Sequence, residues 1–140
     1  MKRKKHTFEE KVDIWQKVID KNYHILKSRT WFNIQSTSII ALLFSAVFGL
    51  LIYALVRPAT SNTVSATNIS AVVIIGLCAI AVWYFVSVNI FFFSIVKRVE
   101  KGADIFKMRK QVQLWIRLGL IRWPSKYILP TEDDIEKFSK

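Results

Sequence analysis

Small and hydroxyl-bearing side chains recur at every fourth position in the first long apolar segment of the chain. They are Thr37, Ala41, Ser45 and Gly49, and this spacing places them along one face of a helix. Small side chains let two membrane helices approach closely, so that hydroxyl groups can bond across the contact. This face is the predicted helix-packing interface. The spacing does not say whether the neighbour is the second apolar segment or another subunit.

A second set of polar side chains interrupts the other long apolar segment, at Ser87, Asn89 and Ser94. Ser87 and Ser94 share one face of a helix, and Asn89 is turned away from that face. An amide in hydrocarbon needs a hydrogen-bond partner. The three residues therefore line a water-filled pore or form hydrogen bonds between helices, and the sequence leaves both interpretations open.

Other reactive residue types form no pattern typical of catalysis or metal binding. Neither apolar segment contains Asp, Glu, Lys, Arg or His, so it holds no proton relay or gating charge, and a transporter is not expected. His6 and His24 have no Cys or acid at metal-ligand spacing, and Cys78 is the single cysteine. No phosphate-binding Gly-rich loop or nucleophile triad is visible. We expect no enzyme, no metal and no cofactor.

Both sets of polar residues lie in uncharged runs that are long enough to cross a bilayer. The runs cover residues 34–56 and 69–96. At about 1.5 Å per residue, a helix over either run spans a hydrocarbon core of about 30 Å. Residues 57–68 are rich in Ser, Thr and Asn and are predicted to be a short extracytoplasmic loop. The predicted fold is an all-α membrane protein built on a two-transmembrane helical hairpin.

Basic residues gather at the two ends of the chain. Of 21 Lys and Arg, nine precede Ser36, eleven follow Val96, and Arg57 is the only charged residue between these points. Cytoplasmic flanks of membrane helices carry such an excess. Both termini should face the cytoplasm, with the protein in the cell (inner) membrane. The same rule and anionic lipid explain the net charge of +11, so nucleic acid is not expected as a partner.

The first 33 residues are predicted to form a cytoplasmic amphipathic helix. Thr7 and Glu10 have the spacing of a capping box, which marks a helix start. No Gly or Pro follows before Gly49, so the helix should continue into the first span, with a bend between Lys27 and Thr30 as an alternative. An apolar stripe would pack on another helix or lie in the lipid head groups. Its members are Phe8, Val12, Trp15, Ile19, Tyr23 and Leu26.

Residues 97–140 are predicted to form a second cytoplasmic helical region. Gly102 marks a break, and a helix should end around Gly119, with a terminal helix capped by Thr131. Residues at helical spacing give this region its own stripe, at Ile105, Met108, Val112, Trp115 and either Leu118 or Gly119. A hairpin returns the chain to the same side, so the two stripes can pack together. Such a thin unit buries little alone, which favours oligomerisation.

Two short segments next to the spans resemble those of small bacterial two-span proteins. They are Ile14-Trp15-Gln16-Lys17-Val18-Ile19-Asp20 and Ile95-Val96-Lys97-Arg98-Val99-Glu100-Lys101-Gly102. The chain resembles RipA-type octameric membrane proteins and related two-span effectors of antiphage defence. The resemblance implies a homo-oligomer with a central axis. For the defence-associated members it implies membrane permeabilisation, often under the control of a cytoplasmic partner.

The sequence therefore supports a first hypothesis, a homo-oligomeric pore or membrane-permeabilising effector with a cytoplasmic helical collar. The alternative is a non-conducting membrane anchor or accessory subunit that holds a cytoplasmic protein partner at the membrane. A third hypothesis is a lipid-surface sensor that uses the helix from Phe8 to Leu26.

Overall fold

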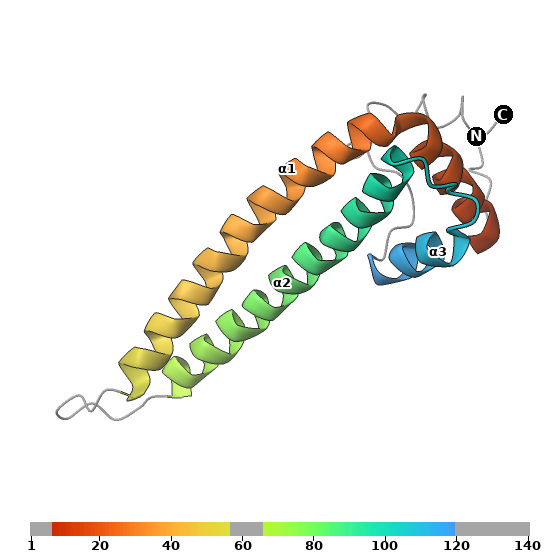
Figure 1. Cartoon of the computed structure of the whole chain (residues 1–140). Helices are drawn as coiled ribbons and strands as arrows, with labels where there is room; N and C mark the ends of the chain where they lie inside the picture. The colour runs from red at the N-terminus through yellow and green to blue at the C-terminus, as the bar shows by residue number, and fades with distance from the viewer. Residues whose placement is uncertain (1–6, 57–65, 120–140) are drawn as a thin grey trace, which may run out of the picture. The chain divides into compact units, whose positions relative to one another are not determined.

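A computed structural model describes residues 7–56 and 66–119, which form three helices and the turns between them (Figure 1). They are α1 (Phe8–Val56), α2 (Ala66–Glu100) and α3 (Arg109–Leu118). The predicted all-α fold class is confirmed, because two long apolar helices are packed as a hairpin and a short third helix follows. The basic run at residues 2–5, most of the predicted loop and the helix after Thr131 lie outside the described residues.

The chain divides into two compact units, and both long helices pass through each of them. The hairpin unit is Ile34–Ser87 and holds the apolar part of α1 and most of α2. The terminal unit combines Met1–Asn33 with Val88–Lys140, and so joins the two flanks of the hairpin. The boundary in α1 coincides with the predicted start of the first span at residue 34.

The start of α1 is fixed by the predicted capping box, which the structure confirms. The backbone N–H of Glu10 donates to Oγ1 of Thr7 at 3.2 Å. In return, the backbone N–H of Thr7 donates to Oε2 of Glu10 at 3.0 Å. These bonds satisfy amides that have no partner inside the helix, and the acidic first turn suits the helix dipole.

A bend in α1 lies at Asn22, not between Lys27 and Thr30. Asn22 has non-helical backbone angles, with φ −123° and ψ 19°. Its side-chain Nδ2 donates to the carbonyl of Val18 at 3.1 Å, one turn earlier. A side-chain amide on that carbonyl competes with the helix's own hydrogen bond, which is a recognised cause of bending.

The helix break predicted at Gly102 is confirmed, because α2 ends at Glu100 and Gly102 lies in the turn that follows. Gly102 has φ +90°, a conformation that costs glycine little, and its N–H donates to the carbonyl of Val99 at 2.9 Å. The Asp104 carboxylate then accepts the N–H of Phe106 at 2.9 Å. Ile105 is therefore in the turn and not in a helix. At the other end, α2 begins at Ala66, inside the predicted loop.

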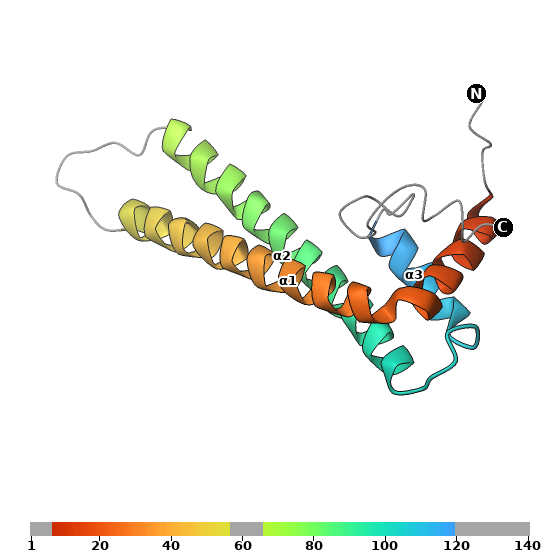
Figure 2. The same cartoon turned by 90° about the horizontal axis from the view of Figure 1, so that it is seen from above.

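The core of the terminal unit is built on three aromatic rings, one from each helix. Phe92 stacks on Trp115 with ring centroids 4.0 Å apart and planes at 14°. Trp15 meets Trp115 edge to face at 4.8 Å. In Figures 1 and 2 the first part of α1 and α3 lie together accordingly. Aliphatic side chains complete this core, among them Val12, Val18, Ile19, Leu26, Ile95, Val96, Val99, Ile105, Val112 and Ile116.

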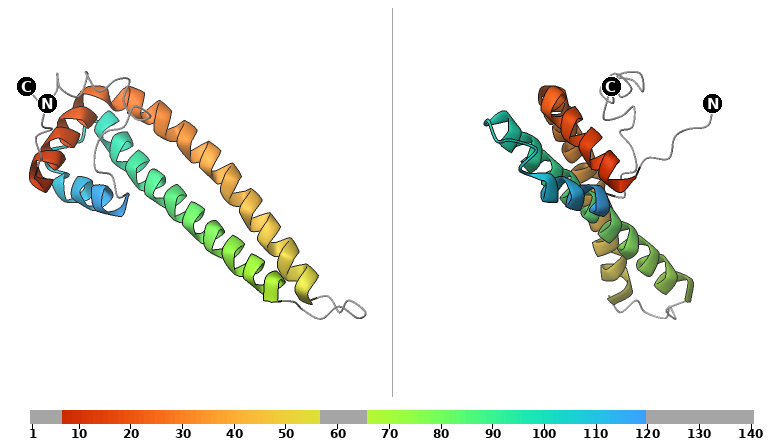
Figure 3. Two further views of the ribbon diagram at one scale, coloured as in Figure 1. Left: turned by 180° about the vertical axis from the view of Figure 1, so that it is seen from behind. Right: turned by 90° about the vertical axis from the view of Figure 1, so that its right-hand side faces the viewer.

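The hairpin unit has little core of its own. Its α1 and α2 segments run antiparallel (Figure 3) and meet closely where Gly76 faces Phe48. A Cβ at Gly76 would lie 2.8 Å from Cε2 of Phe48, which is closer than real Cβ contacts allow. Most large apolar side chains of this unit point outward, including Leu42, Leu43, Leu50, Tyr53, Ile74, Leu77 and Ile80.

Gly76→Ala should destabilise the hairpin relative to Gly49→Ala. A Cβ at Gly49 meets no atom within 4 Å, whereas the one at Gly76 collides with Phe48. Both substitutions gain the same helix propensity, so the difference between their free energies of unfolding measures the contact of residue 76 with Phe48. We expect Gly76→Ala to have a free energy of unfolding about 1–3 kcal/mol lower than Gly49→Ala. Unfolding in sodium dodecyl sulfate measures it, and equal stabilities would refute the contact.

Candidate functional site

The predicted helix-packing face on α1 divides into a closed part and an open part. Ala41 is fully buried. The Ser45 hydroxyl donates to the carbonyl of Ala41 at 2.8 Å and accepts a hydrogen bond from Nε1 of Trp83 at 3.0 Å. The half-buried Thr37 donates to the carbonyl of Ile34 at 3.3 Å. At Ser45, therefore, the neighbour of this face is α2 of the same chain.

Gly49 is the open part of the same face. It is exposed, and a Cβ built there would meet nothing within 4 Å. A small residue gives no advantage to a helix that faces empty space or lipid, because its value lies in close approach. The packing of the hairpin itself therefore does not require a small residue at Gly49.

The polar residues of α2 fall in different surroundings. Ser87 is exposed, and its hydroxyl donates to the carbonyl of Trp83 at 2.9 Å. This bond to its own helix satisfies the hydroxyl, so Ser87 can face lipid or water. Asn89 and Ser94 are half-buried in the terminal unit, and Asn89 has an interaction partner. A shared pore lining for the three stays a prediction.

The apolar stripe near the N-terminus lies in the core of the terminal unit. Val12, Trp15, Ile19 and Leu26 are almost completely buried, and Phe8 and Tyr23 are half-buried against them. This face of α1 is covered by α2 and α3, because the core it joins contains residues of both helices. Packing between helices therefore uses the stripe, and lipid head groups could reach it only if the unit opened.

Gln16 is a buried polar residue that the sequence analysis did not single out. It is 1% exposed, and its Nε2 donates to the carbonyl of Ile105 at 2.9 Å and lies 3.4 Å from that of Phe106. The amide thus satisfies carbonyls in the turn that joins α2 to α3. Because buried polar groups are costly without partners, this bond fixes the position of the turn.

Arg109 ties the start of α3 to the start of α1. Its guanidinium donates to Oε2 of Glu9 at 2.5 Å and also to the Asp13 carboxylate. The hydrogen bond to Glu9, followed by that to Asp13, raises the pKa of Arg109 above its usual value. This cluster is exposed, so its Coulomb energy is modest, and its geometry orients α3.

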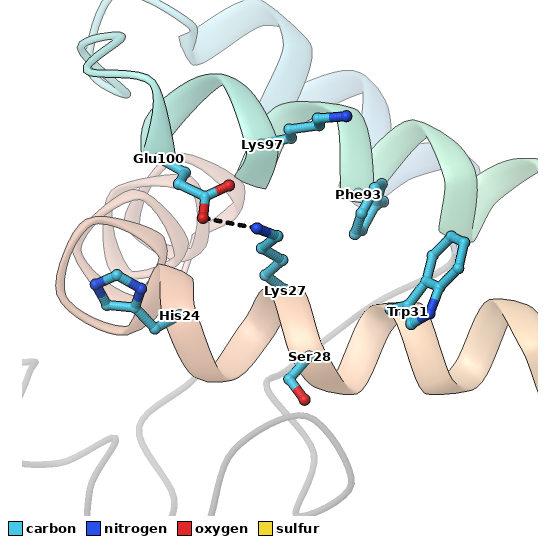
Figure 4. A pocket seen from close by; sticks show the side chains of 7 residues that line it. All are labelled: His24, Lys27, Ser28, Trp31, Phe93, Lys97 and Glu100. Carbon is cyan, nitrogen blue, oxygen red and sulfur yellow. Dashed lines mark hydrogen bonds and ion pairs between the residues drawn. The ribbon is translucent and has the colours of Figure 1, made fainter.

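A groove in the terminal unit combines charged and aromatic side chains, as Figure 4 shows. Nζ of Lys27 is 2.6 Å from Oε1 of Glu100, and this hydrogen bond is the main cause of a lowered pKa at Glu100. Trp31 and Phe93 lie with ring centroids 5.6 Å apart. The hollow has a volume of about 590 Å³ and is largely open to its surroundings. Its lining also includes His24, Ser28 and Lys97.

No protein-family model, curated protein or solved structure matches this chain. Within residues 7–56 and 66–119, no group of three or more His, Cys, Asp or Glu side chains is placed to hold a metal ion.

Gln16→Leu should destabilise the terminal unit. Leucine has a similar size but leaves the buried carbonyl of Ile105 without its donor, which costs about 1–3 kcal/mol. The matched control is Gln113→Leu, because Gln113 is only half-buried and its contacts to Glu9 are long, at 3.4 Å. Thermal unfolding followed by tryptophan fluorescence measures both variants. Equal losses would contradict the role of Gln16.

Proposed function

We propose that the protein is a homo-oligomeric two-span membrane protein that permeabilises the membrane holding its hairpin. The observation that carries this proposal is Gly49, a small residue left open on a face where Ala41 is buried and Ser45 bonds to α2. A second copy of the chain is the neighbour that would use it.

Insertion is supported by the outward apolar surface of the two long helices. Each contains an 18-residue window of mean hydropathy 2.5, long and apolar enough to cross a membrane. Only 6% of that window in α1 and 17% in α2 are buried. The core helices of a soluble protein would be mostly buried, so this surface needs lipid or another chain to cover it.

The composition of the terminal unit supports one topology. Its core joins residues before the first predicted span to residues after the second, as in the contact of Trp15 with Trp115. If both helices cross a bilayer, these flanks can meet only on the same side. The excess of Lys and Arg in both flanks makes that side the cytoplasm.

Assembly is supported by what the hairpin lacks. Its helices meet closely at Gly76 and share a side-chain hydrogen bond at Ser45, while large apolar side chains point outward. Membrane helices associate through packing and polar contacts, and a two-helix hairpin offers few of either. A Cβ built at Gly49 meets no atom within 4 Å, so this position leaves room where a further helix could approach.

Permeabilisation rests on two further supports. The Ser87 hydroxyl is exposed on the hairpin unit, where a ring of subunits could turn it toward water. The segments Ile14–Asp20 and Ile95–Gly102 resemble those of RipA-type octameric proteins and two-span antiphage effectors. For the antiphage effectors, the resemblance implies permeabilisation.

A second candidate function is a membrane anchor for a cytoplasmic partner. The observation that favours it is an exposed apolar surface on the terminal unit, where Leu114 is 49% and Leu118 is 37% exposed. They are four residues apart and share one face of α3. Phe106, in the preceding turn, is 54% exposed. A partner protein could cover these residues.

Native mass spectrometry of wild type, Gly49→Leu and Ala54→Leu tests the two candidates together. Ala54 is exposed and lies about 140° around the helix from Gly49, so Ala54→Leu adds the same kind of bulk on another face. We expect a discrete oligomer for wild type and Ala54→Leu. Gly49→Leu should weaken each subunit contact roughly tenfold, the effect of about 1.4 kcal/mol of overpacking.

Release of a trapped dye from liposomes is the functional readout for the same three proteins. Release by wild type and Ala54→Leu, with loss in Gly49→Leu, is the expected result. A monomeric wild type with tight liposomes would contradict the proposal. A stoichiometric complex with another protein would instead favour the anchor.

A further inference from the structure

We propose that the groove lined by Lys27, Trp31, Phe93, Lys97 and Glu100 binds the head group of an anionic phospholipid. The proposal rests on the membrane insertion proposed above, but it does not depend on pore formation. All five residues belong to the terminal unit, so the site is formed within one compact unit.

The groove is graded from polar to apolar along its length. Figure 4 shows the ion pair of Lys27 and Glu100 at one end, beside His24, and the rings of Trp31 and Phe93 at the other. A phospholipid has the same order of chemistry, with a charged phosphate followed by glycerol and acyl chains. A free anion would need only the first end of the groove.

The positions of these residues in the sequence agree with a groove whose aromatic end lies nearer the membrane than its charged end. Trp31 is three residues before the predicted first span, and Phe93 lies in the last turn of the predicted second span, which ends at Val96. Trp31 is 50% exposed, as expected for an amphipathic ring at the level of the head groups. Lys27, Lys97 and Glu100 are farther from the hydrocarbon. The apolar end of the groove therefore faces the acyl chains.

The charge of the groove suits a single phosphodiester. Two lysines against one glutamate leave one positive charge when His24 is neutral. Lys27 has a carboxylate partner, whereas Lys97 is exposed and lines the groove from α2. Its ammonium has three donors for phosphate oxygens. Basic pockets beside membrane helices on the cytoplasmic side bind anionic head groups in this way.

Lys97→Gln tests the site, and Lys101→Gln is its matched control. Lys101 follows one turn later, is exposed and does not line the groove, so both variants lose the same charge at the same end of α2. Each protein is reconstituted in nanodiscs of phosphatidylcholine with a minor fraction of phosphatidylglycerol. Native mass spectrometry then counts the phosphatidylglycerol molecules that stay bound after release of the protein.

We expect wild type and Lys101→Gln to retain about one phosphatidylglycerol per chain and Lys97→Gln to bind it roughly tenfold more weakly. Equal losses in both variants would show diffuse attraction and overturn the site, as would no retention by wild type. Displacement by millimolar inorganic phosphate would show that phosphate alone is recognised, and would overturn a lipid as the occupant.

Flotation with vesicles of pure phosphatidylcholine separates this proposal from the proposed function. A protein that resists alkaline extraction from these vesicles but retains no phosphatidylglycerol is inserted, and then only the lipid site fails. A protein that does not insert overturns both proposals.

Discussion

The contact of Trp15 with Phe92 and Trp115 is the interaction on which the terminal unit depends. It joins one ring from each helix, and the two flanks that supply the rings are separated in sequence by the whole hairpin. Helix α3 has only 10 residues, which is too short to be stable alone in water. Its stability must come from this core, assisted by Arg109 at its start. This core can form only if the hairpin brings the chain after α2 back beside the first part of α1.

The terminal unit contains side-chain hydrogen bonds between distant parts of the chain, as well as local ones such as that of Asn22. In the hairpin unit, the hydroxyls of Thr37, Ser45 and Ser87 bond to carbonyls of their own helices, so no charge or water is needed there. In the terminal unit, Gln16 and Arg109 join parts of the chain that are 89 or more residues apart. A hydroxyl group that bonds to a carbonyl of its own helix is suited to a lipid environment. Polar contacts between distant parts of the chain instead help to specify a fold that water surrounds.

Local patterns in the sequence were sufficient for several features. The capping box of Thr7 and Glu10 and the break at Gly102 depend on neighbours within a few residues, and both are confirmed. The two apolar helices follow from composition alone. The bend was misplaced because its cause, the bond from the Asn22 side chain to Val18, looks in sequence like an ordinary polar residue on a helix.

Other features could not be read from spacing, because their partners are distant. Gln16 sits beside the apolar stripe, and its acceptors belong to a turn 89 and 90 residues later. Phe92 is one of three consecutive phenylalanines, and nothing in that run shows which ring enters the core. The small-residue face was visible, but only the structure separates the packed Ser45 from the open Gly49. The groove could not be predicted from spacing either, because its lining residues come from both α1 and α2.

The most direct test is to determine on which side of the membrane the loop between α1 and α2 lies, and on which side α3 lies. In a Cys78→Ser background, single cysteines are placed at Asn62, in the predicted extracytoplasmic loop, and at Lys110, on the exposed surface of α3. A membrane-impermeant maleimide is then added to intact cells. The account predicts labelling of Asn62→Cys at once and of Lys110→Cys only after permeabilisation. Labelling of both in intact cells, or the reverse order, would contradict it.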